Sequence, residues 1–420
     1  MCNDYRHLSL KGFTHQTMHD KEKAKRIINI CYLIVIIIFT IICFELFRRM
    51  LINYNGHYKS DFPYYVKRGI NWDYNCLRMP YVIFGVSYKV LGSGTFVNVV
   101  TALVIAATII INKHYIESFT GKISNENTVD FFAVRSLSIL AIFCGPMYIR
   151  GFHETFYKNS FPTYTWQSPT QQAMTLFSVA VLLFFFKMFE KYEEGIKIKY
   201  WILTMIMCLL SAYAKPSFMM CAIMSLIVVF VIELFRDRGI SFKNKLGKLV
   251  IMGLSMVPSG IYILMINFFV YDSAEKKGDG SIVVDITHVL EYHRLGAAII
   301  TGMAFPIIVY LFNIRKWKEK KNTMLFSILI MGVLQWALLT ETGRRANHGN
   351  FTWGRIIGCY FLFISALAIA YDNYKDKEFL SRNKLIRIAY FSVIVCVLAL
   401  HVCSNLYYFY SMCTGHGYYI

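Results

Sequence analysis

The first long apolar run of the chain reads INICYLIVIIIFTIICFELF, from Ile28 to Phe47, and it decides the fold. About 20 consecutive apolar residues are enough for a helix to cross a bilayer. Basic residues crowd the segment just before this run, at positions 21, 23, 25 and 26. Because basic residues tend to stay inside, we expect the N-terminal residues 1–27 in the cytoplasm and residues 48–95 as the first outer loop.

Composition indicates that such runs recur along the whole chain. Of its 420 residues, 56% are hydrophobic and the mean hydropathy is +0.45, which is too apolar for a soluble globular protein. The formal net charge of +19 would suggest nucleic acid as the partner of a soluble domain. Here most of the excess falls in short loops between apolar runs, so we predict membrane lipid and no nucleic acid as a partner.

The fold class predicted is all-α: one polytopic transmembrane bundle over residues 1–420, with about 11 crossings. The expected spans are 28–47, 96–111, 131–149, 170–186, a hairpin over 200–235, 249–271, 295–312, 324–340, 351–371 and 386–407. The stretch 79–92 is too short and polar to span, so we expect an amphipathic helix along the membrane face in the first outer loop. Residues 408–420 would form an outer tail, which places the C-terminus outside.

The hairpin is interrupted at Lys215-Pro216-Ser217. Its first arm, residues 200–214, rises only about 22 Å at 1.5 Å per residue, which is less than a hydrocarbon core of roughly 30 Å. Lys215 is therefore expected below the outer surface. Broken backbone at this depth is tolerated where it is buried in protein or lines a cavity.

Three smaller features have local structural explanations. Ser168 followed by Pro169 is typical of a helix start, with the serine hydroxyl accepting from a backbone N–H. Arg135, near the cytoplasmic end of its run, is expected to reach the interface by snorkelling. Glu45 is expected to pair with the arginines three and four residues later.

Basic residues also gather on the predicted outer side, where the positive-inside tendency would normally remove them. The group comprises Lys215, Arg294, Arg344, Arg345, His348 and Arg355. Arginine forks suit phosphate and lysine adds a point charge, so the group is predicted to bind a lipid phosphate or pyrophosphate. Alternatively, these residues pair with lipid headgroups or with Glu341, Asp272 and Glu291.

Asp61 lies in the outer stretch GHYKSDFP, residues 56–63. It either caps the helix that begins at Phe62-Pro63 or acts as a general base for an acceptor hydroxyl. Other candidates on the same side, for the base or for contact with the acceptor, are His57, Asp73, His153, Glu154 and Trp166. There is no phosphate-binding glycine loop and no metal-ligand cluster in the sequence, so no cofactor is predicted and no metal is indicated.

Several of these features also carry a resemblance. An outer acidic residue, a surface helix leading into the second crossing, and a short hairpin with Ala214-Lys215-Pro216-Ser217 resemble the GT-C class of membrane glycosyltransferases. A closer resemblance is to a group of uncharacterised bacterial multi-pass membrane proteins. Its motifs are Ser60-Asp61-Phe62-Pro63, Trp166-Gln167-Ser168-Pro169-Thr170, Lys215-Pro216-Ser217-Phe218 and His348-Gly349-Asn350-Phe351-Thr352-Trp353-Gly354.

The GT-C resemblance implies an enzyme of a bacterial cytoplasmic (inner) membrane that uses a polyprenyl-phosphate-linked sugar. It would transfer the sugar to an extracytoplasmic glycan or glycolipid acceptor, with Asp61 as the catalytic base and polyprenyl phosphate as the leaving group. The chain departs from the paired acidic motif of many members, since Lys59-Ser60 precede Asp61.

Two other functions stay open. One is an O-antigen-type polymerase or ligase acting on lipid pyrophosphate glycans, which also needs outer arginines. The other is a lipid-linked glycan transporter or flippase. A transporter would favour internal repeats and charges at the middle of the membrane, and the sequence shows neither.

Overall fold

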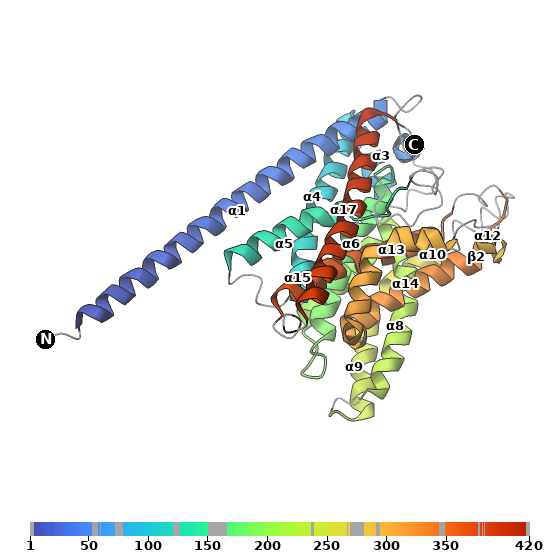
Figure 1. Cartoon of the computed structure of the whole chain (residues 1–420). Coiled ribbons are helices and arrows are strands. Elements are labelled where there is room, and N and C mark those ends of the chain that lie inside the picture. The colour runs from blue at the N-terminus through green and yellow to red at the C-terminus, as the bar shows by residue number, and fades with distance from the viewer. Residues whose placement is uncertain are drawn as a thin grey trace.

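The computed structural model describes residues 4–52, 58, 60–71, 79–120, 127–149, 166–236, 239–266, 268, 281–290, 295–343, 349–376, 379, 381 and 383–416, with residues 4–19 as backbone only. The described part is almost entirely helical (Figure 1). Its elements are α1 (Asp4–Ile52), α2 (Phe62–Ile70), α3 (Met79–Leu91), α4 (Thr95–Thr120), α5 (Thr128–Leu140), η3 (Ala141–Phe143), α6 (Pro169–Phe189), α7 (Ile198–Ala214), α8 (Ser217–Phe235), α9 (Phe242–Leu254), α10 (Val257–Ile266), β1 (Ile282–Val284), α12 (Thr287–Leu290), α13 (Leu295–Phe312), η5 (Ile314–Lys318), α14 (Lys320–Leu338), β2 (Leu339–Glu341), α15 (Thr352–Lys375) and α17 (Lys384–Thr414).

Eight of the described helices are long and apolar enough to cross a membrane, and α9 with α10 would make a ninth span, bent by 46°. The eight are α1, α4, α6, α8, α13, α14, α15 and α17. The chain is therefore a helical multi-pass membrane protein, as predicted. α1 leans away from the other helices over much of its length, and only 17% of its most apolar window is buried, which suits a helix surrounded by lipid (Figure 1).

The expected span 131–149 is wrong as a continuous helix. α5 ends at Leu140, the short η3 follows, and residues 144–149 are extended. The cause is the pair Gly145-Pro146, because proline disfavours helical geometry in the residue before it and has no N–H to donate. The run is apolar enough to span, but its backbone does not stay helical.

Two other helices supply the hydrogen bonds that this extended segment needs. Met147 N–H donates to Thr301 O of α13 over 2.9 Å, and Tyr148 N–H donates to Ser404 Oγ of α17 over 3.1 Å. Irregular backbone at membrane depth is stable only where neighbouring protein groups satisfy it in this way. The segment is thus held between α13 and α17.

A buried histidine completes this arrangement beside Pro306, which lies inside α13. Thr301 O of α13 accepts from the extended segment, and the Phe305 N–H donates to His401 Nε2 over 3.3 Å. His401 Nδ1 then carries the ring proton and donates it to Gly145 O, so one neutral imidazole links α13, α17 and the extended segment.

α7 and α8 form the hairpin that the sequence predicts. α7 ends at Ala214, Lys215 is extended with φ −162° and ψ 122°, and α8 begins at Ser217. With 17 residues, α7 rises about 25 Å, which is less than a hydrocarbon core of about 30 Å. The predicted break at Lys215-Pro216 is confirmed.

A two-stranded sheet, which the all-helical prediction missed, joins two loops. β1 pairs antiparallel with β2, with Ile282 opposite Glu341 and Val284 opposite Leu339. Beyond the strands, Thr342 N–H donates to Ser281 O over 2.9 Å. The pairing fixes residues 281–284 to the end of α14.

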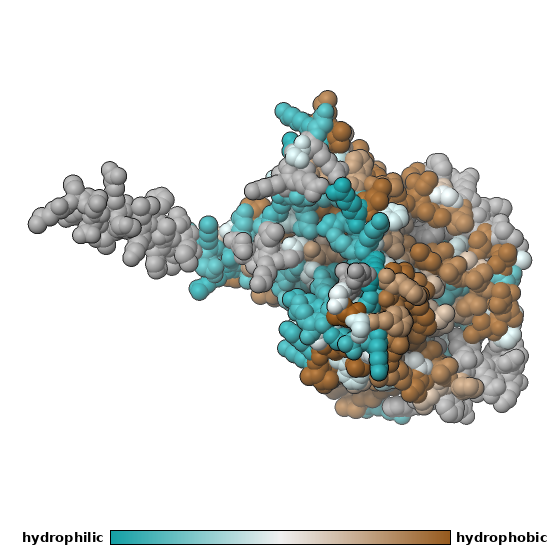
Figure 2. Space-filling view, turned by 90° about the horizontal axis from the view of Figure 1, so that it is seen from below, coloured by the Kyte–Doolittle hydropathy of each residue, from teal (hydrophilic) through white to brown (hydrophobic). Residues whose placement is uncertain are grey.

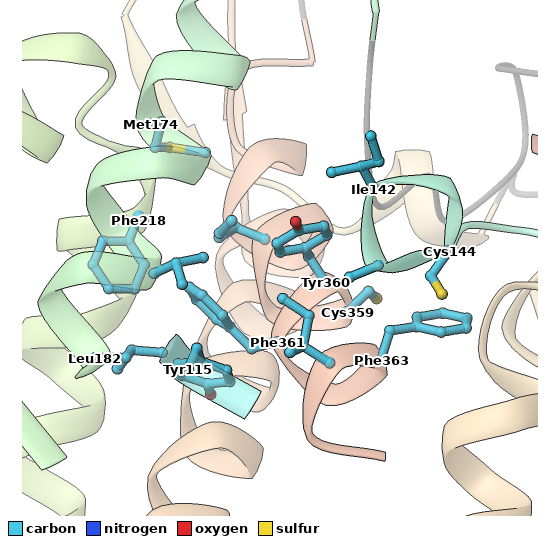
Figure 3. Packing of buried hydrophobic residues seen from close by; sticks show 14 of the residues in the cluster. Tyr115, Ile142, Cys144, Met174, Leu182, Phe218, Cys359, Tyr360, Phe361 and Phe363 are labelled. Atoms are coloured by element: carbon cyan, nitrogen blue, oxygen red, sulfur yellow. The ribbon is translucent and has the colours of Figure 1, made fainter. Parts of the chain in front are cut away.

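α15 and α6 lie at the centre of the bundle. In their most apolar windows 89% and 78% of the residues are buried. Figure 3 shows Phe361 of α15 beside Phe218 of α8 and Tyr115 of α4, with ring centroids 5.6 and 6.4 Å apart, and Met174 of α6 nearby. A helix that is buried on all sides fixes the position of everything attached to its ends.

Glycines allow α14 and α15 to approach closely. A Cβ added to Gly332 would lie 2.5 Å from the carbonyl carbon of Gly354, and one added to Gly358 would lie 2.8 Å from Leu329 Cα. Gly354 and Gly358 are four residues apart on α15, which is the small-residue spacing typical of close helix pairs in membranes.

We predict that Gly332→Ala destabilises the protein by about 1–3 kcal/mol, because a new methyl group would meet backbone atoms that cannot move aside. Thermal unfolding in detergent micelles measures the effect. Gly247→Ala in α9 is the control, since a Cβ there has nothing within 4 Å, and alanine is the better helix former by up to about 1 kcal/mol. Equal melting temperatures for the two variants would contradict the close approach.

The end of the bundle opposite α2 and α3 holds buried ion pairs, and Figure 2, seen from below, shows hydrophilic side chains gathered there. Glu233 is 1% exposed and accepts from Tyr192 Oη (3.3 Å) and Arg236 Nη1 (3.4 Å). Lys320 Nζ lies 3.9 Å from Glu233 and 2.5 Å from Glu193. These contacts join the α6–α7 connection, the end of α8 and the start of α14, all in the region predicted to be cytoplasmic.

The sequence predicts local roles for two charged residues in or beside α1, Arg135 and Glu45. The prediction that Arg135 reaches the interface by snorkelling is wrong, because the residue is 6% exposed and its Nε donates to Asn29 Oδ1 of α1 over 2.7 Å. A polar partner inside the bundle removes the need to reach the interface. The local pairing of Glu45 is confirmed, with Arg48 Nε at 2.7 Å and Arg49 Nε at 2.8 Å.

Candidate functional site

Hydrogen bonds join three distant segments at the end of the bundle that holds α2 and α3, called here the upper end (Figure 1). Ser60 Oγ accepts from Phe62 N–H over 3.1 Å and donates to Gln167 O over 2.9 Å. Tyr408 Oη of α17 donates to Gln167 Oε1. The motif around Ser60 and the motif around Gln167 therefore touch, although about 100 residues separate them in the sequence.

Asp61 occupies the position just before α2, but its side chain does not cap the helix. The neighbouring Ser60 hydroxyl takes that role through its bond with the Phe62 N–H. The capping interpretation of Asp61 is therefore wrong. The Asp61 side chain is exposed at the upper end, where an incoming hydroxyl group could reach its carboxylate.

α6 begins at Pro169 as predicted, although Ser168 makes a different bond from the one expected. The Ser168 hydroxyl pairs with Thr170 Oγ1 at 3.2 Å and makes no capping bond to a backbone N–H. Gln172 Nε2 donates to Trp166 O over 2.8 Å and closes the turn that precedes the helix.

Trp166 itself lies in the core and is 1% exposed. Its ring lies 4.5 Å from that of Phe409 and 6.0 Å from that of Phe39, measured between centroids. Its role as a contact for the acceptor stays a prediction. The indole anchors the residues before α6 between α1 and α17.

Two of the predicted phosphate-binding cations lie against tryptophan rings, one at the start of α15 and one near the end of α14. Lys215 Nζ is 3.2 Å from the ring centroid of Trp353, and Arg355 Cζ is 4.2 Å from that of Trp336. Trp353 and Arg355 are two residues apart on α15, so both cations belong to one region. Lys215 is half-buried and Arg355 is 3% exposed, and a ring face attracts such desolvated cations more strongly than exposed ones.

The pairing of α6 with α7 places Lys215 beside the start of α6. At the lower end Lys187 Nζ of α6 lies 5.6 Å from the ring centroid of Tyr200 of α7. Both helices rise 1.5 Å per residue and run in opposite directions. Fifteen residues further up each helix, about 22 Å from that contact, Gln172 of α6 is expected near the height of Lys215. α3 also contacts α7, which brings the α2–α3 pair to the same end.

The upper end thus combines one exposed carboxylate with cations that are shielded from water. A carboxylate of this kind can accept a proton from a hydroxyl group, and shielded cations can stabilise a phosphate oxyanion. Among the residues that the structure describes, no three His, Cys, Asp or Glu side chains form a group that could hold a metal ion.

Several predicted site residues lie outside the described residues. They are His57, Asp73, His153, Glu154, Arg294, Arg344, Arg345 and His348, together with the alternative partners Asp272 and Glu291. Their roles stay predictions.

The sequence-based prediction did not single out Gln171 and Gln172. Both are buried in the first turn of α6, and neither has any exposed area. A signal was present, because two adjacent amides at the start of an otherwise apolar run are unusual for a helix that faces lipid.

No protein family matches this sequence, and no curated protein matches it either. Function therefore has to be inferred from the side chains and their geometry.

We predict that Ser60→Ala lowers the free energy of unfolding by about 1–2 kcal/mol, because it removes both the cap of α2 and the bond to Gln167 O. Asp61→Asn, one residue away, should lower the free energy of unfolding less than Ser60→Ala does, since the Asp61 side chain does not cap the helix. Thermal unfolding of the two purified variants compares them. A larger loss for Asp61→Asn would give Asp61 the structural role instead.

Proposed function

We propose that the chain is a membrane glycosyltransferase. It transfers a sugar from a polyprenyl-phosphate carrier to an extracytoplasmic glycan or glycolipid acceptor in a bacterial cytoplasmic membrane. The observation that supports the proposal is that Lys215 and Arg355 lie against tryptophan rings in one region, while the Asp61 segment belongs to the α2–α3 pair, whose α3 contacts α7 below Lys215. These residues come from the beginning, middle and end of the chain, and the cations are held against Trp353 and Trp336.

The proposed reaction uses one base and two cations. The Asp61 carboxylate accepts the proton of an acceptor hydroxyl, and the acceptor oxygen forms a bond to the anomeric carbon of the sugar. The bond between that carbon and the phosphate oxygen breaks, and the electron pair leaves with the phosphate. Lys215 and Arg355 stabilise the resulting polyprenyl phosphate, and their partial burial strengthens this interaction.

Placing the reaction outside the cell agrees with the charges at the lower end. That end holds the buried group around Glu233 and Lys320 and the basic connections before α7 and after α13. The positive-inside tendency assigns such a face to the cytoplasm, which leaves the upper end outside.

Asp61→Asn should lower the rate of sugar transfer at least about a hundredfold, because the amide cannot accept the proton. The assay supplies purified protein with polyprenyl phosphates that carry radiolabelled glucose, mannose, galactose or arabinose, and with envelope glycan from the producing cells. The control is Glu194→Gln, which removes an exposed carboxylate paired with Lys191 (3.5 Å) beyond the lower end of α6. Undiminished transfer by Asp61→Asn would remove Asp61 from the mechanism.

Lys215→Ala should weaken binding of polyprenyl phosphate about tenfold or more, since it removes a charge-assisted contact with the phosphate. The matched control is Lys187→Ala, which also removes a lysine that lies near an aromatic ring, but at the lower end of the bundle. Titration in lipid nanodiscs measures both affinities. Equal affinities for the two variants would place the phosphate elsewhere.

In the transfer assay, single sugar additions support the proposal, whereas long chains would indicate the polymerase alternative.

A further inference from the structure

Gln171 is the described residue whose buried side chain has the most unused hydrogen-bonding capacity. It has no exposed area, and neither its amide nitrogen nor its amide oxygen has a hydrogen-bond partner among the residues that the structure describes. Two other buried side chains, one on α6 and one on α7, each have one polar atom without a hydrogen-bond partner among the described residues, namely Gln172 Oε1 and Ser211 Oγ. Buried polar groups are nearly always paired, so such a group marks a place for a ligand or a water molecule.

Other polar side chains on the same helix differ from Gln171. Thr175 Oγ1 donates to Gln171 O over 2.9 Å, and Ser178 Oγ donates to Thr175 O over 3.1 Å. Both hydroxyl groups are satisfied by their own helix, as is usual for Ser and Thr in membrane helices. Gln171 therefore stands out on α6 as a group that the protein alone does not satisfy.

The position of Gln171 links it to the proposed phosphate site. It lies in the first turn of α6, next to Gln172, which helix geometry puts near the height of Lys215. On α7, Ser211 lies one turn below Lys215 and accepts the Lys215 N–H through its backbone oxygen at 2.9 Å. A phosphate held by Lys215 would carry its sugar into the neighbourhood of these amide and hydroxyl groups.

We infer that Gln171 binds hydroxyl groups of the sugar on the polyprenyl-phosphate carrier and so contributes to sugar recognition. The inference rests on the proposed function. A carboxamide offers two N–H donors and one oxygen acceptor, and neighbouring sugar hydroxyls offer both complements. Because Gln171 is fully buried, the upper end of α6 has to open as the sugar enters, and the bound sugar is then shielded from water. Shielding favours transfer to the acceptor over hydrolysis.

The test compares two lipids and three variants in nanodiscs. The lipids are bare polyprenyl phosphate and the polyprenyl-phosphate sugar that the wild-type protein binds best among the glucose, mannose, galactose and arabinose forms. Gln171→Leu should keep the wild-type affinity for the bare lipid and lose about tenfold for the sugar-bearing one, as expected for one or two lost hydrogen bonds. Lys215→Ala should weaken binding of both lipids. Thr175→Val, a buried polar-to-apolar exchange one turn below Gln171, should change neither affinity.

A stability measurement separates sugar binding from a structural role. If the Gln171 amide is unpaired without ligand, Gln171→Leu should leave the melting temperature of the lipid-free protein unchanged or raise it. A lower melting temperature together with wild-type discrimination between the two lipids would mean that Gln171 holds a structural water, and would overturn the inference. Wild-type affinity of Gln171→Leu for the sugar-bearing lipid would also overturn it while leaving the proposed function intact. Failure of the wild-type protein to bind either lipid would overturn both.

Discussion

The close contact of α14 with α15 at Gly332 and Gly354 is the constraint on which the upper end depends. It leaves no room for a side chain between the two backbones, so the start of α15 has one position relative to α14. Trp353 and Arg355 flank Gly354, and the tryptophan that receives Arg355 comes from α14. The same contact between α14 and α15 also fixes the position of Trp353, whose ring lies against Lys215. Backbone packing between two helices thus sets the positions of both cations.

The two ends of the bundle hold their charges by different physical means. At the lower end, acidic partners surround the basic residues, and Glu233 has a tyrosine, an arginine and a lysine around it. At the upper end, Lys215 and Arg355 lie against indole rings. A ring face attracts and orients a cation and adds no opposite charge of its own. Cations oriented in this way suit a site that has to receive an anion.

The sequence predicts well those features that depend on hydropathy or on one strong local signal. The first span, the hairpin broken at Lys215-Pro216 and the start of α6 at Pro169 are of this kind. It fails where a distant partner decides the outcome. Arg135 is held by Asn29 of another helix, and β1 pairs with β2 more than 50 residues away. At the candidate site, Lys215 and Arg355 could be named from their charge, but their tryptophan partners follow only from the packing of α15.

The imidazole of His401 also has a mechanical consequence. Two bonds from this side chain to backbone groups, together with the backbone bond between Met147 and Thr301, cross-link α13, α17 and residues 144–149. Sliding any one of the three past the others would break several bonds at a depth where no solvent can replace them. These three segments therefore form a rigid part of the molecule. Any rearrangement that admits a bulky lipid headgroup therefore falls to other segments, such as the start of α6 and the hairpin, where α7 is short and is followed by the extended Lys215.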